Sequence, residues 1–208
     1  MVVFVHGGPI PRDGVPKPRD WPLFRGYASL VAAQGLVGVI FDHPLHDLMD
    51  YPRSAQTIRD VVDRVRAERG VDPDRVALWA FSGAGLFAAS WLRDHHRWLR
   101  CVALTYPVVE PLPGWVVDAR FRPITAVRSM PRPSIVLTRV GREVPEIAAG
   151  VDAFVEAAGR TNLAMIDLPD SVHGFDHREH TKQARDGVQR AVEAVADVLR
   201  AGVAGSTL

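Results

Sequence analysis

The chain has 208 residues, of which 47% are hydrophobic and 24% charged, and its formal net charge at pH 7 is +1. This length suits one domain with one core, and the composition is ordinary for a globular protein. The near balance of charge leaves no basic surface of the kind that binds nucleic acid or an anionic membrane. We therefore predict a single domain, residues 1–208, whose partner is a small molecule, with no nucleic acid and no membrane.

Short β-branched and apolar runs alternate along the chain with longer helical patterns. This alternation predicts an α/β fold, a parallel sheet with helices on both faces. The proline-rich residues 107–133 interrupt the pattern and are expected to form a short, irregular, cap-like segment. The predicted strands are residues 2–5, 36–41, 76–80, 101–106, 134–139 and 163–167, and the predicted helices are residues 24–34, 53–69, 85–93, 151–158 and 181–201.

The N-terminal residues MVVFVHGG contain neither a basic stretch nor an apolar run long enough for a signal peptide. The single cysteine, Cys101, lies in the apolar run CVALTYP, which predicts a buried thiol. Together these features favour a cytoplasmic protein. His43, His46 and Asp47 lie close together, but in a proline-containing loop this spacing is more typical of hydrogen bonding than of a metal site. We expect no metal and no cofactor.

Ser82 lies in WAFSGAG, directly after the apolar run of a predicted strand. A nucleophilic serine on a sharp turn between a strand and a helix needs small neighbours, and Ala80 and Ala84 meet that need. The usual pattern is G-x-S-x-G, whereas this chain has alanine at both glycine positions. On this segment alone, Ser82 is either a nucleophile or a polar residue in a structural turn.

The first predicted strand ends in His6-Gly7-Gly8-Pro9. Consecutive glycines after a buried strand allow backbone N–H groups to point into a cavity as an oxyanion hole. Pro9 has no N–H, so the expected donor of this loop is Gly8, with Gly7 or Ile10 as alternatives. The second expected donor is the amide of Gly83, the residue after the serine.

A histidine with the features of a general base lies far downstream, in the segment SVHGF. His173 follows the last predicted strand, is followed by a glycine, and precedes the terminal helix. From this position an imidazole is able to reach the carboxyl end of the sheet, where Ser82 is expected.

The segments VFVHGGP, WAFSGAG and SVHGF, in this order, resemble those of α/β-hydrolases. The HGF ending is most similar to dienelactone-hydrolase-like and prolyl-oligopeptidase-like members. The resemblance covers nearly the whole chain, and it implies a serine hydrolase that cleaves a small-molecule ester through an acyl-enzyme, with Ser82 as nucleophile and His173 as base. A dienelactone hydrolase itself would carry cysteine in place of Ser82, so an esterase-like activity is favoured.

The resemblance also implies an acidic residue after the strand that follows the cap region. The corresponding stretch is RVGREVP, in which Glu143 stands where the family commonly has aspartate. A glutamate is able to hold the histidine in the same way. Asp170 and Glu146 remain as alternatives, and Arg142 beside Glu143 offers it a different partner.

The parent fold implies six parallel strands in the order 4-3-5-6-7-8, without the two strands that usually precede them. One sheet edge is then bare, and we expect a homodimer or another segment to cover it. A non-catalytic domain of the same fold, which binds a ligand or partner, is the alternative to the enzyme. The residues expected to line the substrate pocket are Pro9, Ile10, Tyr106, Trp115 and Phe175.

Overall fold

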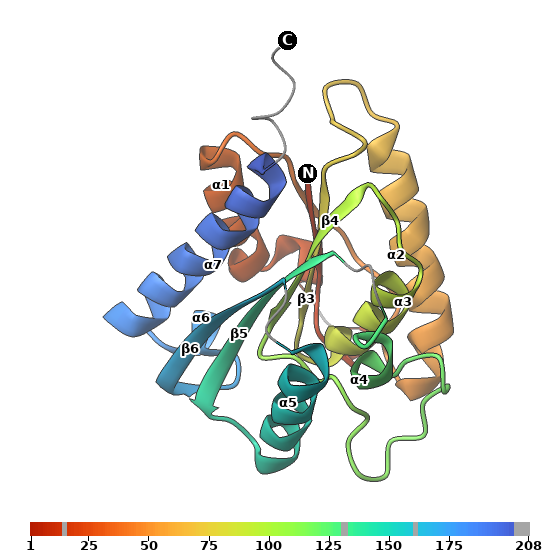
Figure 1. Ribbon diagram of the computed structural model, residues 1–208, viewed down its shortest axis with the longest axis vertical. Coiled ribbons are helices and arrows are strands. Elements are labelled where there is room, and N and C mark those ends of the chain that lie inside the picture. Colours follow the sequence, from red (N-terminus) through yellow and green to blue (C-terminus); the bar gives the residue numbers. More distant parts are fainter. Residues whose placement is uncertain (14–15, 130–132, 160–161, 202–208) are drawn as a thin grey trace.

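The computed structural model describes residues 1–13, 16–129, 133–159 and 162–201. A sheet of six parallel strands forms its centre, in the order β2-β1-β3-β4-β5-β6 (Figure 1). If the strands are numbered 3 to 8, as in the parent fold, this order reads 4-3-5-6-7-8, so the predicted topology is confirmed. The strands are β1 (Val2–Val5), β2 (Gly38–Ile40), β3 (Val76–Phe81), β4 (Leu99–Thr105), β5 (Ser134–Arg142) and β6 (Leu163–Val172).

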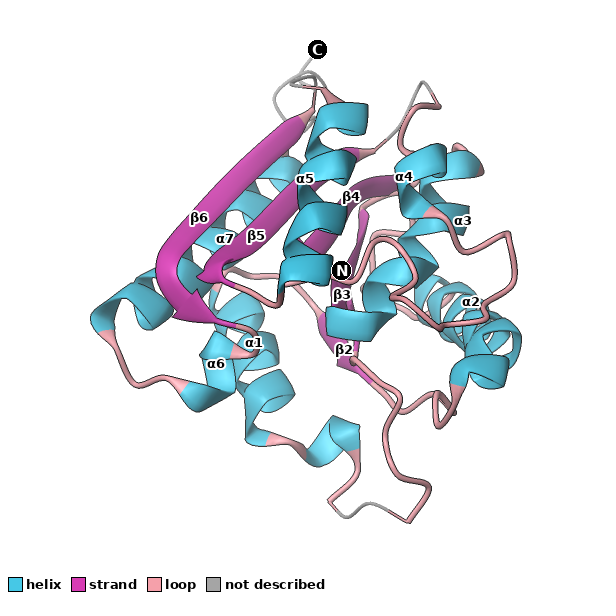
Figure 2. Ribbon diagram, turned by 90° about the horizontal axis from the view of Figure 1, so that it is seen from below, coloured by secondary structure: helices cyan, strands magenta, loops and turns pink. Residues whose placement is uncertain are grey.

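Helices cover both faces of the sheet (Figures 1 and 2). The first and last long helices lie side by side on one face, and the remaining long helices cover the other. The α-helices are α1 (Pro22–Ala33), α2 (Tyr51–Arg66), α3 (Ala88–Arg93), α4 (Pro123–Ala126), α5 (Pro145–Ala158), α6 (Phe175–Arg178) and α7 (Lys182–Arg200), and the 3₁₀ helices are η1 (Pro18–Asp20), η2 (Leu48–Asp50) and η3 (Ser82–Phe87).

Alternate residues of each central strand point into two separate hydrophobic clusters. In β1, Val3 packs into the cluster under α2 and α3, and Phe4 packs into the cluster under α1 and α7. All six residues of β3 are buried. A parallel sheet buried on both faces produces such uninterrupted apolar runs, which is why the strands were recognisable in the sequence. Cys101 in β4 is also buried, as predicted, and burial raises the pKa of its thiol to about 12.

Two strands extend beyond their predicted ends. The prediction ended them at residues 139 and 167, whereas β5 continues to Arg142 and β6 to Val172. The two strands stay paired through an irregular step between Val140 and Arg142, so both reach further past the carboxyl edge of the sheet than β3 does. This extension carries Glu143 and His173 to the same place.

Part of the segment 107–133 packs on one face of the sheet; residues 130–132 lie outside the described residues. Its buried side chains, among them Val109 and Phe121, pack into the cluster under α2 and α3. The segment contains α4 and contacts α3 and α5 through it. The cap-like role expected for this segment stays a prediction.

Strand β2 lies at one edge of the sheet and is only three residues long. Very short edge strands offer few unpaired amides to another chain. The homodimer expected from a bare edge stays a prediction. Within the described part of the chain, no helix has the length and apolar character needed to span a membrane.

Candidate active site

Ser82 occupies the turn between β3 and η3, and its backbone has a φ of 51°. A residue other than glycine in this left-handed region is strained, and such strain is concentrated at functional sites. The turn is tightly enclosed: a Cβ at Gly83 would overlap the carbonyl oxygen of Gly8, and one at Gly85 would lie 2.5 Å from the Val108 carbonyl oxygen. Glycine at these two positions therefore allows the turn to form.

Three side chains from the carboxyl ends of three strands form a hydrogen-bonded row. The Oγ of Ser82 lies 2.8 Å from Nε2 of His173, and Nδ1 of His173 lies 2.8 Å from Oε2 of Glu143. Because a carboxylate only accepts, the Nδ1 proton of His173 points to Glu143 and its Nε2 is free to accept from the serine. The structure thus brings together the three residues that the sequence singled out.

Glu143 is nearly buried, and the backbone N–H of the next residue holds its carboxylate. Its side chain is only 4% exposed, against 26% for His173. Its second oxygen, Oε1, accepts a hydrogen bond from the Val144 N–H at 2.8 Å. Both carboxylate oxygens therefore have a partner, and neither partner is Arg142.

The two alternative acids lie elsewhere. Asp170 accepts a hydrogen bond from the side chain of Gln183 on α7. Glu146 is exposed in the first turn of α5. Of the three acidic candidates, Glu143 is the one that contacts His173.

The loop after β1 lies against the serine turn, as an oxyanion hole requires. Gly7 and Gly8 both approach this turn, since a Cβ at Gly7 would lie 3.0 Å from the Ser82 Cβ. The N–H of Ile10 already donates to the Leu45 carbonyl at 2.9 Å, which removes Ile10 as an alternative donor. Gly83, the other expected donor, is held by Tyr51, whose hydroxyl donates to the Gly83 carbonyl at 2.9 Å.

A stacked pair of histidine rings lies next to the loop after β1. His6 and His43 are both buried, and their ring centroids lie 3.7 Å apart. The backbone N–H of His43 donates to Nε2 of His6, so the ring proton of His6 is on Nδ1. This Nδ1 donates to the Gly7 carbonyl at 2.7 Å. Burial lowers the pKa of both imidazoles. His46 and Asp47 have other partners, Ile10 and Arg12, so these residues do not converge on a common point.

A pocket of about 290 Å³ opens over Ser82 and His173. Pro9, Ile10 and Tyr106 line it, as expected from the sequence. Trp115 and Phe175 do not line it: Trp115 packs on the opposite face of the sheet, and Phe175 is fully buried with its ring 5.8 Å from that of Tyr106. The pocket has further walls that the sequence did not indicate, formed by Trp21, Leu23, Phe24, His177 and Arg178.

A buried carboxylate, which the sequence did not indicate, contacts the pocket residue Tyr106. The side chain of Asp176 is 0% exposed and accepts hydrogen bonds from the hydroxyls of Tyr106 and Tyr27. Burial raises the pKa of both phenols well above the ordinary value, so both remain protonated donors. The Tyr106 ring in turn lies 4.8 Å from the His173 ring.

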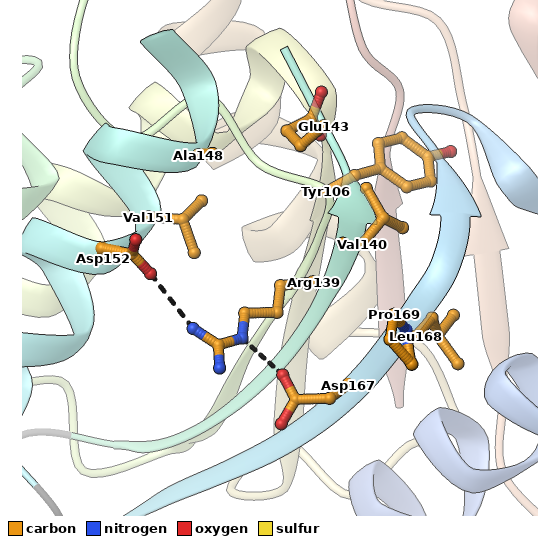
Figure 3. Close-up of a pocket in the computed structure, with 11 residues that line it drawn as sticks. Tyr106, Arg139, Val140, Glu143, Ala148, Val151, Asp152, Asp167, Leu168 and Pro169 are labelled. Carbon is orange, nitrogen blue, oxygen red and sulfur yellow. Dashed lines mark hydrogen bonds and ion pairs between the residues drawn. The ribbon is translucent and has the colours of Figure 1, made fainter. Parts of the chain in front are cut away.

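A second cavity, also of about 290 Å³, lies between α5 and the ends of β5 and β6, and Glu143 is one of its lining residues (Figure 3). Its charged groups already have partners. Arg139 donates to Asp152 at 3.1 Å and also bonds Asp167, as the dashed lines in Figure 3 show. Glu143 contacts His173 instead.

Comparison with known proteins gives a match in structure alone. No protein-family model and no curated protein matches the sequence. A thermophilic esterase, Est2, from the planctomycete Thermogutta terrifontis is 18% identical, with a TM-score of 0.71 over 95% of this chain and 81% of that one. Esterase LipW from Mycobacterium marinum is 17% identical, with a TM-score of 0.72 over 95% and 72%.

Carboxyl esterase 2 from the fungus Tuber melanosporum is similar to the same extent, with 15% identity and a TM-score of 0.70 over 95% of this chain and 78% of that one. At such low identity, a structural likeness speaks for the fold. The strand order agrees with this likeness, as does the strained serine turn after β3. The chain has the α/β-hydrolase fold.

Proposed function

We propose that this protein is a serine hydrolase that cleaves carboxylic esters of small molecules through an acyl-enzyme. One observation carries the proposal: Ser82, His173 and Glu143 form a continuous hydrogen-bonded row whose serine lies on a strained turn at the floor of a pocket. A nucleophile, a base and a residue that orients the base are the three parts that such chemistry needs.

In the first half of the reaction, Oγ of Ser82 attacks the ester carbonyl while its proton passes to Nε2 of His173. The negative charge on the carbonyl oxygen is stabilised by the N–H groups of Gly8 and Gly83. The C–O bond to the alcohol then breaks, and the leaving oxygen takes the proton from His173. Glu143 keeps the Nδ1 proton in place and stabilises the imidazolium.

In the second half, a water molecule gives a proton to His173 and attacks the acyl carbon. The bond between that carbon and Ser82 breaks, the serine recovers its proton, and the carboxylic acid leaves. Esters suit this site because the chain's own residues supply every proton transfer. No metal or cofactor enters any step.

Structures of one neighbour, the Thermogutta esterase, favour ester hydrolysis as the activity of this chain. Structures of the Thermogutta esterase exist with propionate and with butyrate bound. Another structure of that esterase is phosphoramylated by tabun. We infer that residues 1–208 act as one domain in the cytoplasm. We also infer that this chain is related to dienelactone-hydrolase-like esterases.

The decisive experiment combines labelling with turnover. We expect a fluorophosphonate probe to label the wild-type protein and not Ser82→Ala, and p-nitrophenyl acetate hydrolysis to be lost in the same variant. Urea unfolding of Ser82→Ala serves as the folding control. Undiminished hydrolysis by Ser82→Ala would refute the mechanism, and absence of both labelling and turnover in the wild type would favour the alternative, a non-catalytic ligand-binding domain.

A further inference from the structure

An apolar hollow larger than the catalytic pocket lies beside it, between α1 and the segment that contains α6 and α7. We call it the α1 groove and define it by Trp21, Leu23, Gly26, Leu30, His177 and Val188. Its volume is about 700 Å³, compared with about 290 Å³ for the pocket over Ser82. Sites for small ligands usually measure about 300–1,000 Å³ and are mostly apolar, so the groove alone is large enough to hold one.

The groove and the catalytic pocket adjoin each other. Trp21, Leu23 and His177 line both. The side chain of His177 is 54% exposed. A substrate whose carbonyl lies at Ser82 therefore has the groove as the neighbouring apolar surface for its chain.

Gly26 keeps the groove open. It lies inside α1, five residues from the helix start, where glycine is less favourable than alanine. Its φ is not positive, and a Cβ built on it would meet nothing within 4 Å. Neither backbone conformation nor close packing therefore requires a glycine here. What the missing side chain provides is free volume in the wall of the groove.

The groove offers apolar contact and little charge. Leu23, Leu30 and Val188 are apolar, and the carboxylate of Asp176 at its edge is buried and already accepts from Tyr27 and Tyr106. The lining includes no lysine or arginine, and its other ionisable side chains are Tyr27, His177 and His180. A hydrocarbon chain would gain by leaving water for this surface.

We propose that the α1 groove binds a straight hydrocarbon chain of the ester that is hydrolysed at Ser82, which makes medium-chain esters the preferred substrate class. This inference rests on the proposed function. The chain belongs either to the acid or to the alcohol, because both are attached to the reacting carbonyl. Two substrate series distinguish these sources.

The first series consists of p-nitrophenyl acetate, butanoate, hexanoate and octanoate, which lengthen the acid. The second consists of ethyl, butyl, hexyl and octyl acetate, which lengthen the alcohol and are followed by titration of the released acid. In one series we expect kcat/KM to rise by about fourfold for each methylene that enters the groove. The series that shows the rise identifies the side of the ester that the groove binds.

The test variant is Gly26→Leu, which fills the groove from a position where the added side chain meets open space. We expect it to reduce kcat/KM for the octyl or octanoyl ester at least about tenfold more than for the shortest ester of the same series. The matched control is Ser29→Leu, an exposed position of the same helix outside the groove, which should leave the chain-length profile unchanged. Urea unfolding checks that both variants are folded.

The outcomes separate the inference from the proposed function. If short esters are hydrolysed with dependence on Ser82, but Gly26→Leu has the same chain-length profile as wild type in both series, the groove proposal is wrong and the esterase proposal stands. If the wild type hydrolyses no ester, calorimetric titration with decanoate and with decanol decides about the groove. Binding by the wild type and by Ser29→Leu, but not by Gly26→Leu, would support the groove proposal. No binding, or equal binding by all three proteins, would overturn it.

Discussion

The hydroxyl of Tyr106 donates to the buried carboxylate of Asp176, at 2.8 Å from Oδ1 and 3.0 Å from Oδ2. Tyr106 directly follows β4 and has a φ of 36°, and Asp176 follows His173 by three residues. The bond therefore ties the segment that carries the proposed base to the centre of the sheet. Since the carboxylate has no access to water, its hydrogen-bond donors must come from the protein.

Tyr106→Phe removes one donor and keeps the ring that packs beside His173. We expect the free energy of unfolding to fall by about 1.5–3 kcal/mol, because a hydrogen bond to a buried charged group is lost. Urea denaturation measures the change. Tyr27→Phe should have a similar effect, since its hydroxyl donates to the same carboxylate at 3.0 Å. A change within about 0.5 kcal/mol for both variants, the range of ordinary surface substitutions, would show that this network does not stabilise the fold.

The stacked histidines predict a loss of stability in mild acid. Burial lowers the pKa of both His6 and His43. The nearby His46 lowers both pKa values further and His6 also lowers that of His43, while the hydrogen bond to the Gly7 carbonyl and the charge of Asp42 oppose the shift at His6. Below the ordinary value of 6.5, the unfolded chain binds protons that the folded chain does not. Stability must therefore decrease as the pH falls from 6.5 towards the lower pKa of the folded state.

We expect each of these histidines to contribute a slope of up to about 1.4 kcal/mol per pH unit in that window. Urea unfolding between pH 8 and pH 5 measures the sum. His43→Gln keeps a neutral donor near the His6 carbonyl and should flatten the slope, whereas the exposed His180→Gln should not. Equal slopes in wild type and His43→Gln would contradict the assignment.

Two glycines, Gly85 in the serine turn and Gly26 in α1, predict opposite effects of the same substitution. Gly85→Ala would place a Cβ 2.5 Å from the Val108 carbonyl oxygen, and we expect a loss of about 1–3 kcal/mol from overpacking. Gly26→Ala, in the open part of α1, should instead stabilise the protein by about 0.5–1 kcal/mol through helix propensity. Thermal or urea unfolding of the two variants distinguishes them, and a neutral Gly85→Ala would show that the turn has room to relax.

These contacts also show how far the sequence predicted the serine turn. The prediction assigned the need for small neighbours to Ala80 and Ala84, two residues before and after Ser82. In the structure both alanines are buried, and Gly83 and Gly85 also have no room for a Cβ. The local sequence was sufficient to identify the turn, but which position touches the loop after β1 depends on how that loop packs.

Strand direction was also predictable from the alternation of strands and helices, and Ser82 and His173 from their places after predicted strands. The strand order and Glu143 came from the resemblance to α/β-hydrolases. The pocket walls were not. Trp115 and Phe175 were chosen as aromatic residues near the site in sequence, whereas Trp21 lines the pocket because α1 lies beside α7. Likewise, the role of Asp176 depends on Tyr27, which is 149 residues away in the chain. No local pattern carries such a contact.

The assignment of Glu143 gives the sharpest test of the proposed mechanism. The Val144 N–H donates to Oε1 of this carboxylate, and Nδ1 of His173 faces Oε2. In Glu143→Gln, the amide oxygen is expected to keep the bond to Val144, so the NH₂ group is directed at His173. An NH₂ group donates, and it therefore favours the tautomer with the proton on Nε2, which is unable to accept the proton of Ser82.

We expect kcat for p-nitrophenyl acetate to fall about 10³- to 10⁴-fold in Glu143→Gln, the size of effect known for the corresponding substitution in a serine protease. Glu143→Asp keeps the charge but is one methylene shorter, so it is unable to satisfy Val144 and His173 together and should retain more activity than the glutamine variant and less than wild type. Glu146→Gln, at an exposed position three residues away, is the matched control and should have wild-type kcat. If Glu143→Gln keeps more than about a tenth of the wild-type rate while Ser82→Ala is inactive, the histidine is held by another group, and the role assigned to Glu143 is wrong even though the nucleophile stands.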